Sequence, residues 1–113
     1  MKRKIAIPVN AEGILDGHFG HCSFFVLIDV DGKEIIAEEK IVPPPHEPGL
    51  LPRWLAERNV TDIIAGGMGH KAIQLFNHQG VNAFVGAPRL SARELAEGFI
   101  NETLTFSANY CNH

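Results

Sequence analysis

The chain has 113 residues, of which 45% are apolar and 20% charged, with a formal charge of −3 and an isoelectric point of about 6.0. This length suits one domain, spanning residues 1–113, with a single core. The net negative charge argues against a nucleic-acid-binding surface, which normally carries a basic patch. The opening run Ile5–Val9 is too short for a signal peptide or a membrane span, so we expect a cytoplasmic protein without a membrane partner.

Apolar periodicity and turn residues predict an α/β domain with a five-stranded mixed sheet and about three helices. The expected strands are 4–9, 24–30, 34–42, 60–65 and 81–86, and the expected helices are 50–58, 72–78 and 91–100. Asp31-Gly32 is a two-residue turn signal, which makes the second and third strands an antiparallel hairpin. The remaining strands should be joined by right-handed parallel crossovers.

Two helix ends can be identified from individual residues in the sequence. Gly80 should end the second helix in a left-handed conformation, and Ser91 with Glu94 forms a capping box at the start of the third. Beyond Asn101 the periodicity weakens, and we expect residues 101–113 to fray as a tail. The alternative is that its Cys111 and His113 fold over a binding site.

The segment Asp16–Phe24 contains the densest ligand chemistry of the chain. His18, His21 and Cys22 are donors suited to zinc, copper or iron–sulfide centres, and the adjacent glycines allow close backbone approach. We predict a binding loop here. The alternative is that the histidines are turn residues and Cys22 is a small buried apolar residue, since the spacing is not a closed four-ligand pattern. The proline-rich stretch 43–49 reads as a linker, or else presents His46 as a further donor.

A second candidate loop is glycine-rich. Gly66, Gly67, Met68, Gly69 and His70 follow a buried strand and lead directly into a helix. This arrangement points free helix-N-terminal amides at whatever lies above the sheet, and it favours an anion. The alternative is that the glycines serve only a tight turn and close packing. Both loops follow the carboxyl ends of strands, where α/β sheets bind ligands, so we expect them to face one cleft.

These motifs resemble the dinitrogenase iron–molybdenum cofactor biosynthesis family, whose members have a ribonuclease H-like fold. The resemblance rests on the segments KIAIPV, DGHFGHC, FFVLIDVDGKEI, AGGMGHKAIQLF and GVNAFVGA, which cover most of the chain through Ala87. It implies a carrier or scaffold for an anionic metal–sulfide cluster: iron–molybdenum cofactor, a precursor, or the molybdenum–copper sulfide cluster of the orange-protein branch. Zinc or copper alone are the other metals that this chain's donors suit.

Carried onto this sequence, the resemblance implies that the cluster is bound by both loops. The implied cofactor-binding residues are His18, Phe19, Gly20 and His21 in the first loop and Gly66, Gly67, Met68, Gly69 and His70 in the second. His21, Cys22 and His70 depart from the commoner family pattern, and Cys22 is added to the expected cofactor-binding residues. With His18 these three form the predicted metal-ligating set. The implied partners are the metal cluster and cofactor-assembly proteins, and we expect a monomer or weak homodimer.

Two other function classes are weighed against the carrier. An enzyme could use Cys22 as nucleophile with His18 or His21 as base and Asp16 to orient it. A protein-interaction module in cofactor assembly would use the first loop only structurally. A two-metal nuclease is excluded by the scarcity of converging carboxylates, since the first strand carries none.

Overall fold

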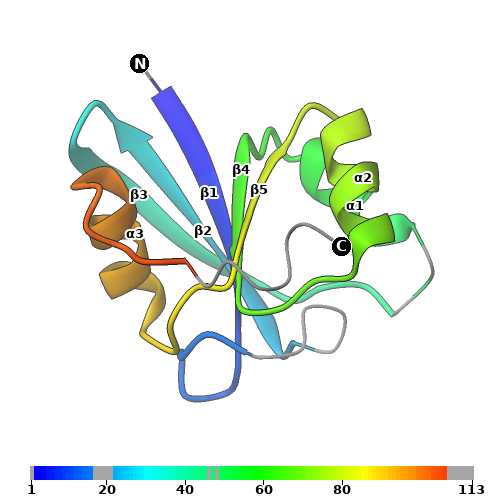
Figure 1. The fold of residues 1–113 in the computed structure, drawn as a ribbon, viewed down its shortest axis with the longest axis horizontal. Coiled ribbons are helices and arrows are strands. Elements are labelled where there is room, and N and C mark those ends of the chain that lie inside the picture. Colours follow the sequence, from blue (N-terminus) through cyan, green and yellow to red (C-terminus); the bar gives the residue numbers. More distant parts are fainter. Residues whose placement is uncertain (1, 17–21, 46, 48, 107–113) are drawn as a thin grey trace.

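The computed structural model describes residues 2–16, 22–45, 47 and 49–106. They form a five-stranded mixed sheet in the order β3-β2-β1-β4-β5, flanked by three helices (Figure 1). The elements in chain order are β1 (Lys2–Val9), β2 (Phe24–Asp31), β3 (Glu34–Ile41), α1 (Leu50–Ala56), β4 (Asp62–Ala65), α2 (His70–His78), β5 (Asn82–Val85) and α3 (Ala92–Ile100). The predicted α/β class, mixed sheet and three helices are confirmed; the ribonuclease H-like label stays a prediction.

Element boundaries differ from the predicted ones by one or two residues at several ends, and three of the differences have a clear cause. β1 begins earlier, at Lys2, because its whole length pairs with β2. α2 begins at His70 and not at Ala72, since the turn before it is already complete at Gly69. The hairpin loop is Gly32–Lys33, because Asp31 still pairs with Glu34, so the predicted turn is shifted by one residue.

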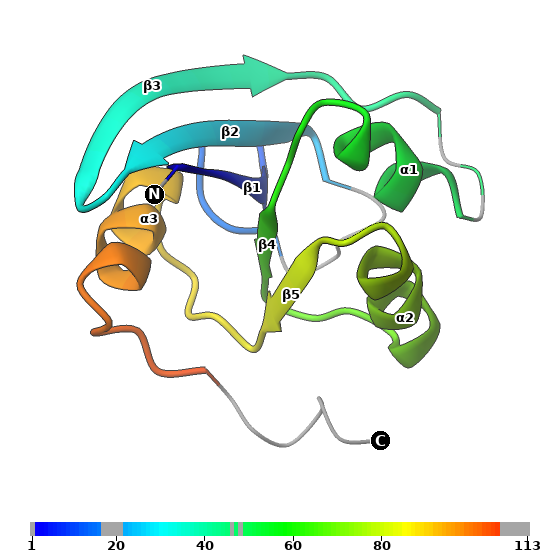
Figure 2. The ribbon, with the colours of Figure 1, turned by 90° about the horizontal axis from the view of Figure 1, so that it is seen from above.

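β1 lies in the middle of the sheet, antiparallel to β2 and parallel to β4. All of its residues from Ile5 to Val9 are buried. The alternation of Ile5, Ile7 and Val9 with Ala6 and Pro8 therefore does not mark a solvent-exposed face of the sheet, because helices cover the sheet on both sides. Viewed from above, α1 and α2 lie on one face of the sheet and α3 alone lies on the other (Figure 2). We call these the two-helix face and the one-helix face.

Each face has its own core. On the two-helix face Phe25, Leu55 and Phe76 are fully buried, and Trp54 packs against this cluster. On the one-helix face β1 and β2 pack against Leu95 and Ala96 of α3. No helix in the described residues combines the length and apolar composition needed to cross a membrane.

The predicted helix ends are confirmed. Gly80 follows α2 with φ +78°, and Ser91 accepts a hydrogen bond from the Glu94 amide while the Glu94 carboxylate accepts one from Ser91.

The predicted frayed tail is wrong for its first part. Leu104 and Phe106 pack against the core of the one-helix face. The fit to α3 is close, because a Cβ at Gly98 would lie 2.8 Å from the Leu104 side chain. Residues 107–113, with Cys111 and His113, lie outside the described residues, and their predicted role is untested.

One charged residue is buried where β4 begins. Asp62 is 1% exposed, and it accepts hydrogen bonds from Thr61 Oγ1 (2.7 Å) and Asn82 Nδ2 (3.1 Å). Arg3 lies 3.7 Å from the same carboxylate. Because a buried carboxylate is costly unless it is hydrogen-bonded and paired, this network fixes the starts of β1, β4 and β5 relative to one another.

Candidate functional site

The ends of four strands meet at one end of the sheet, which we call the loop end. β1 and β4 are parallel neighbours, β4 and β5 are parallel, and antiparallel β2 begins where β1 finishes, with Val9 opposite Phe24. The carboxyl ends of three strands and the start of a fourth therefore lie together, at the foot of β1 in Figure 1. This is the edge at which the sequence predicted a cleft.

The chain after β1 returns to the sheet before the predicted binding loop. The Asn10 side chain accepts hydrogen bonds from the amides of Glu12 and Ile14, which closes a tight turn. The Asp16 amide then donates to Pro8 O (3.0 Å), and on the far side of the loop the Ser23 amide donates to Val9 O (3.1 Å). Both stems of the loop are thus held at the end of β1. His18, Phe19, Gly20 and His21 lie outside the described residues, and their predicted roles stay predictions.

Cys22 is the one predicted donor of the first loop that the structure describes. It is 9% exposed and belongs to the core of the two-helix face, as a free thiol. Burial, together with the negative charge of Asp16, raises the pKa of Cys22 from 9.0 to about 12, against a smaller lowering by a backbone hydrogen bond. The thiol is therefore protonated at neutral pH. It can bind a soft metal only by releasing that proton.

The second loop leads into the N-terminus of α2. Gly69 is the N-cap and offers no side chain to the helix, and the first amide to bond within the helix is that of Ile73, to Gly69 O (3.1 Å). The amides of residues 70–72 therefore have no partner inside the helix. The first turn contains no acidic residue. This helix end presents amide donors and the positive end of the helix dipole.

The backbone conformation of the turn does not require a glycine at position 69. Its φ of −66° is available to any residue, and a Cβ there would meet nothing within 4 Å. Among the described glycines with positive φ, the one near this loop is Gly86 (φ +85°), after β5. The Gly86 amide donates to Gly66 O (3.0 Å), which ties the ends of β4 and β5 together. Sequence reasoning missed this role of Gly86, because it counted Gly86 as the last residue of the predicted strand 81–86, whereas β5 ends at Val85.

His70 and Met68 lie on either side of the cap and have different surroundings. Met68 is partly buried and packs against the core of the two-helix face. His70 is exposed, and its Nε2 lies 3.2 Å from Nε2 of Gln74. Since an amide nitrogen only donates, this contact requires an unprotonated Nε2 on His70.

The structure brings only part of the predicted site together. Cys22 and the 66–70 turn lie at the same end of the sheet, with Asp16 close enough to Cys22 to affect its pKa. Within the described ranges there is no group of three or more His, Cys, Asp or Glu side chains that could hold a metal ion. A metal held by three such side chains would therefore need at least one donor from outside the described residues, where His18, His21, His46, Cys111 and His113 lie.

A profile of the family described as "Dinitrogenase iron-molybdenum cofactor" matches residues 1–102. The chain belongs to this family, in which iron–molybdenum cofactor is bound or assembled. None of the curated proteins searched matches the chain.

Solved structures share the fold. The crystal structure of PH0822 superimposes with a TM-score of 0.87 at 24% identity, covering 97% of this chain and 99% of that one. The apo form of the orange protein from Desulfovibrio gigas gives 0.77 at 22%, covering 94% and 93%. The protein mj0327 from Methanocaldococcus jannaschii gives 0.76 at 16%, covering 96% and 98%. At these identities the likeness establishes the architecture of the whole chain, not its ligand.

Proposed function

We propose that this protein is a non-catalytic carrier of an anionic iron- or molybdenum-containing sulfide cluster, bound at the loop end of the sheet. The observation that carries the proposal is the open N-terminus of α2. Its cap, Gly69, leaves space where any other residue would place a Cβ, and its first turn has no acid. Free amides at a helix N-terminus stabilise a negatively charged group. Family membership supplies the class of cargo.

The remaining residues of the second loop suit the same cargo. Met68 would supply an apolar, polarisable wall beside the sulfides, and Lys71 adds a positive charge to the first turn of α2. His70 would donate to a sulfide once its ring is protonated or turned away from Gln74. His18, Phe19, Gly20 and His21 keep their proposed roles as the opposite wall.

A catalytic role for Cys22 is disfavoured by its environment. A nucleophilic cysteine needs a lowered pKa and access to substrate, whereas burial and Asp16 raise the pKa of Cys22 to about 12. The same thiol can still become a ligand, because a soft metal competes with the proton for sulfur. Cys22 is therefore proposed as a direct ligand of a copper or iron atom of the cluster, and not as a reactive thiol.

Binding can be tested by anaerobic titration of the metal-free protein with tetrathiomolybdate, with and without copper, and separately with isolated iron–molybdenum cofactor. Visible absorbance and metal content are measured after desalting. We expect a coloured species retained at a fixed metal-to-protein ratio. The probe that is retained distinguishes a molybdenum–copper cluster from an iron–molybdenum one.

Two variants locate the bound cluster. Gly69→Ala fills the open space at the cap and should weaken binding about tenfold, with little change in melting temperature. His70→Gln should weaken binding, whereas His78→Gln, at the other end of the same helix, is the matched control and should not. If no probe is retained, or if Gly69→Ala binds like the parent protein, the carrier proposal is wrong at this site. The alternative of a purely protein-binding module then takes its place.

A further inference from the structure

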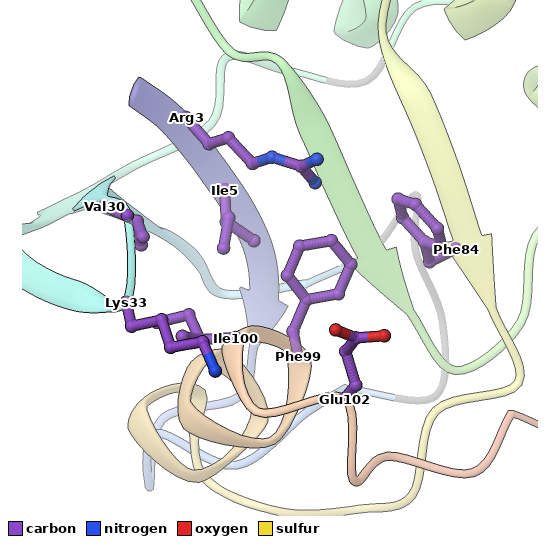
Figure 3. Close-up of a pocket in the computed structure, with 9 residues that line it drawn as sticks. Arg3, Ile5, Val30, Lys33, Phe84, Phe99, Ile100 and Glu102 are labelled. Carbon is purple, nitrogen blue, oxygen red and sulfur yellow. The ribbon is translucent and has the colours of Figure 1, made fainter. Parts of the chain in front are cut away.

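A cavity of about 500 Å³ lies on the one-helix face, away from the loop end. Its floor is apolar and includes Ile5 of β1, Phe84 of β5 and Phe99 of α3, while Arg3, Lys33 and Glu102 also line it (Figure 3). This volume is within the range of small-molecule sites, which are mostly apolar with a few polar groups.

The cavity follows from the unequal cover of the sheet. Among the described residues, α3 is the one helix on this face, and it packs over β1 and β2. Two aromatic rings reach Phe84 of β5 from this side. The Phe99 ring of α3 meets it edge-on at 4.9 Å between centroids, and the Phe106 ring, beyond α3, lies at 5.9 Å.

The cavity is separate from the proposed cluster site. The two sites lie on opposite faces of the sheet. Phe84 lies opposite Ile64, close to the loop end, but it packs in the core of the one-helix face, whereas Cys22 and Met68 pack in the core of the two-helix face. The residues that line the cavity include none of the 66–70 turn.

Three charged side chains of the lining differ in their partners. Arg3 is already engaged, with Asp62 Oδ1 at 3.7 Å and the Phe99 ring centroid at 5.6 Å. Lys33 and Glu102, in contrast, have no ion pair with any described residue, including each other, although both line the cavity. A positive and a negative charge, both on exposed residues, thus border an apolar floor without forming an ion pair with one another.

Glu102 is also held in an unusual backbone conformation. Its φ is +57°, at the position after the C-cap of α3, where the Thr103 amide donates to Gly98 O (2.8 Å). Glycine is the usual residue at this point of such a helix end, because a side chain is disfavoured there. Strain of this kind at a cavity wall motivates a functional role for the side chain. Figure 3 shows the Glu102 carboxylate beside Phe99, facing the cavity.

We propose that this cavity binds a small zwitterion with an apolar body, namely an amino acid with an aromatic or branched side chain. The ligand carboxylate pairs with Lys33 and with the exposed side of Arg3, and the ammonium pairs with Glu102. The apolar side chain packs on Phe84 and Phe99. This assignment gives each unpaired charge of the lining a partner, and it uses the apolar floor.

The test is a titration of the ¹⁵N-labelled protein followed by amide chemical shifts, with L-phenylalanine as the probe. Phenylpropionate, which lacks the ammonium, and phenethylamine, which lacks the carboxylate, are the comparison compounds. We expect saturable shifts at residues lining the cavity with L-phenylalanine, and affinities about tenfold lower for each truncated compound, because each leaves one charge unpaired.

Single-charge variants assign the two ends of the ligand. Lys33→Gln and Glu102→Gln should each lower the affinity for L-phenylalanine about tenfold. Lys2→Gln and Glu57→Gln, which remove the same charges outside the cavity, should leave it unchanged. Phenylpropionate binding as tightly as L-phenylalanine would overturn the zwitterion assignment. The absence of saturable shifts with all three compounds would overturn the site itself.

Discussion

The two faces of the sheet are covered unequally. On the two-helix face, α1 and α2 bury Phe25, Leu55 and Phe76 completely. On the one-helix face, α3 protects β1 and β2, but Phe84 and Phe99 stay partly exposed around a cavity. The difference shows that a small domain can bury a core on each face of its sheet and still leave a ligand-sized space where the third helix does not reach. The following predictions test this division.

The largest effect is expected from the core of the two-helix face. Phe76→Ala should lower the free energy of unfolding by about 3–5 kcal/mol, because it empties a fully buried aromatic site. Phe99→Ala should cost about 1–2 kcal/mol, since that ring is only partly buried and loses mainly its contact with Phe84. Urea denaturation of both variants measures the difference. Equal losses would mean that the two faces contribute alike to stability.

A smaller effect is expected from the buried thiol on the same two-helix face. Because the pKa of Cys22 is raised from 9.0 to about 12, the folded and unfolded chains are both protonated below pH 9. Between pH 9 and 12 only the unfolded chain loses this proton, so stability falls as the pH rises. The contribution is at most about 1.4 kcal/mol per pH unit.

The Cys22 contribution is isolated by comparing the parent protein with Cys22→Ala. Urea denaturation under reducing conditions at pH 8, 9 and 10 should show a stability difference that changes by about 1.4 kcal/mol at most between pH 9 and 10. All other ionisable groups are the same in both proteins, so the comparison isolates Cys22. A difference that does not vary with pH would show that Cys22 is not desolvated in the folded state.

The smallest effect is expected at the wall of the cavity. Glu102→Gly should raise the free energy of unfolding by about 1 kcal/mol, because glycine adopts a φ of +57° without strain. The same change should weaken L-phenylalanine binding, so stability and binding move in opposite directions. Glu97→Gly, in the helical part of α3, is the control and should destabilise by about 1 kcal/mol. A Glu102→Gly variant that is less stable than the parent would contradict the strain argument.

Most of the fold was predictable because its signals are local. The Ser91–Glu94 capping box, Gly80 after α2 and the hairpin near Gly32 each depend on a few neighbouring residues, and each is found where it was expected, the hairpin loop shifted by one residue. The burial of both sides of β1 was not predictable from its own pattern. It depends on helices far along the chain that cover the two faces of the sheet.

The candidate sites, like the fold, were predictable where their signals are local in the sequence and not where they depend on distant residues. The 66–70 turn was found from its glycines because a strand, a turn and a helix follow one another in sequence. The burial of Cys22 was one of two alternatives that the sequence left open, and the cavity near Phe99 was not predicted, since both depend on residues brought together by tertiary packing. Glu102 gave no signal at all in the sequence, because a left-handed glutamate looks like any other exposed glutamate until its φ is known.

The central position of β1 has a consequence for the order of folding. Its first neighbour, β2, follows closely in the chain, but its second neighbour, β4, begins only at Asp62, and the Lys4 amide bonds to a side chain 57 residues away. Pairings between distant segments form late because closing a long loop costs entropy. β1 can therefore complete its pairing only after β4 has been synthesised. Until then, β1, β2 and β3 paired by themselves would leave one edge of β1 unpaired.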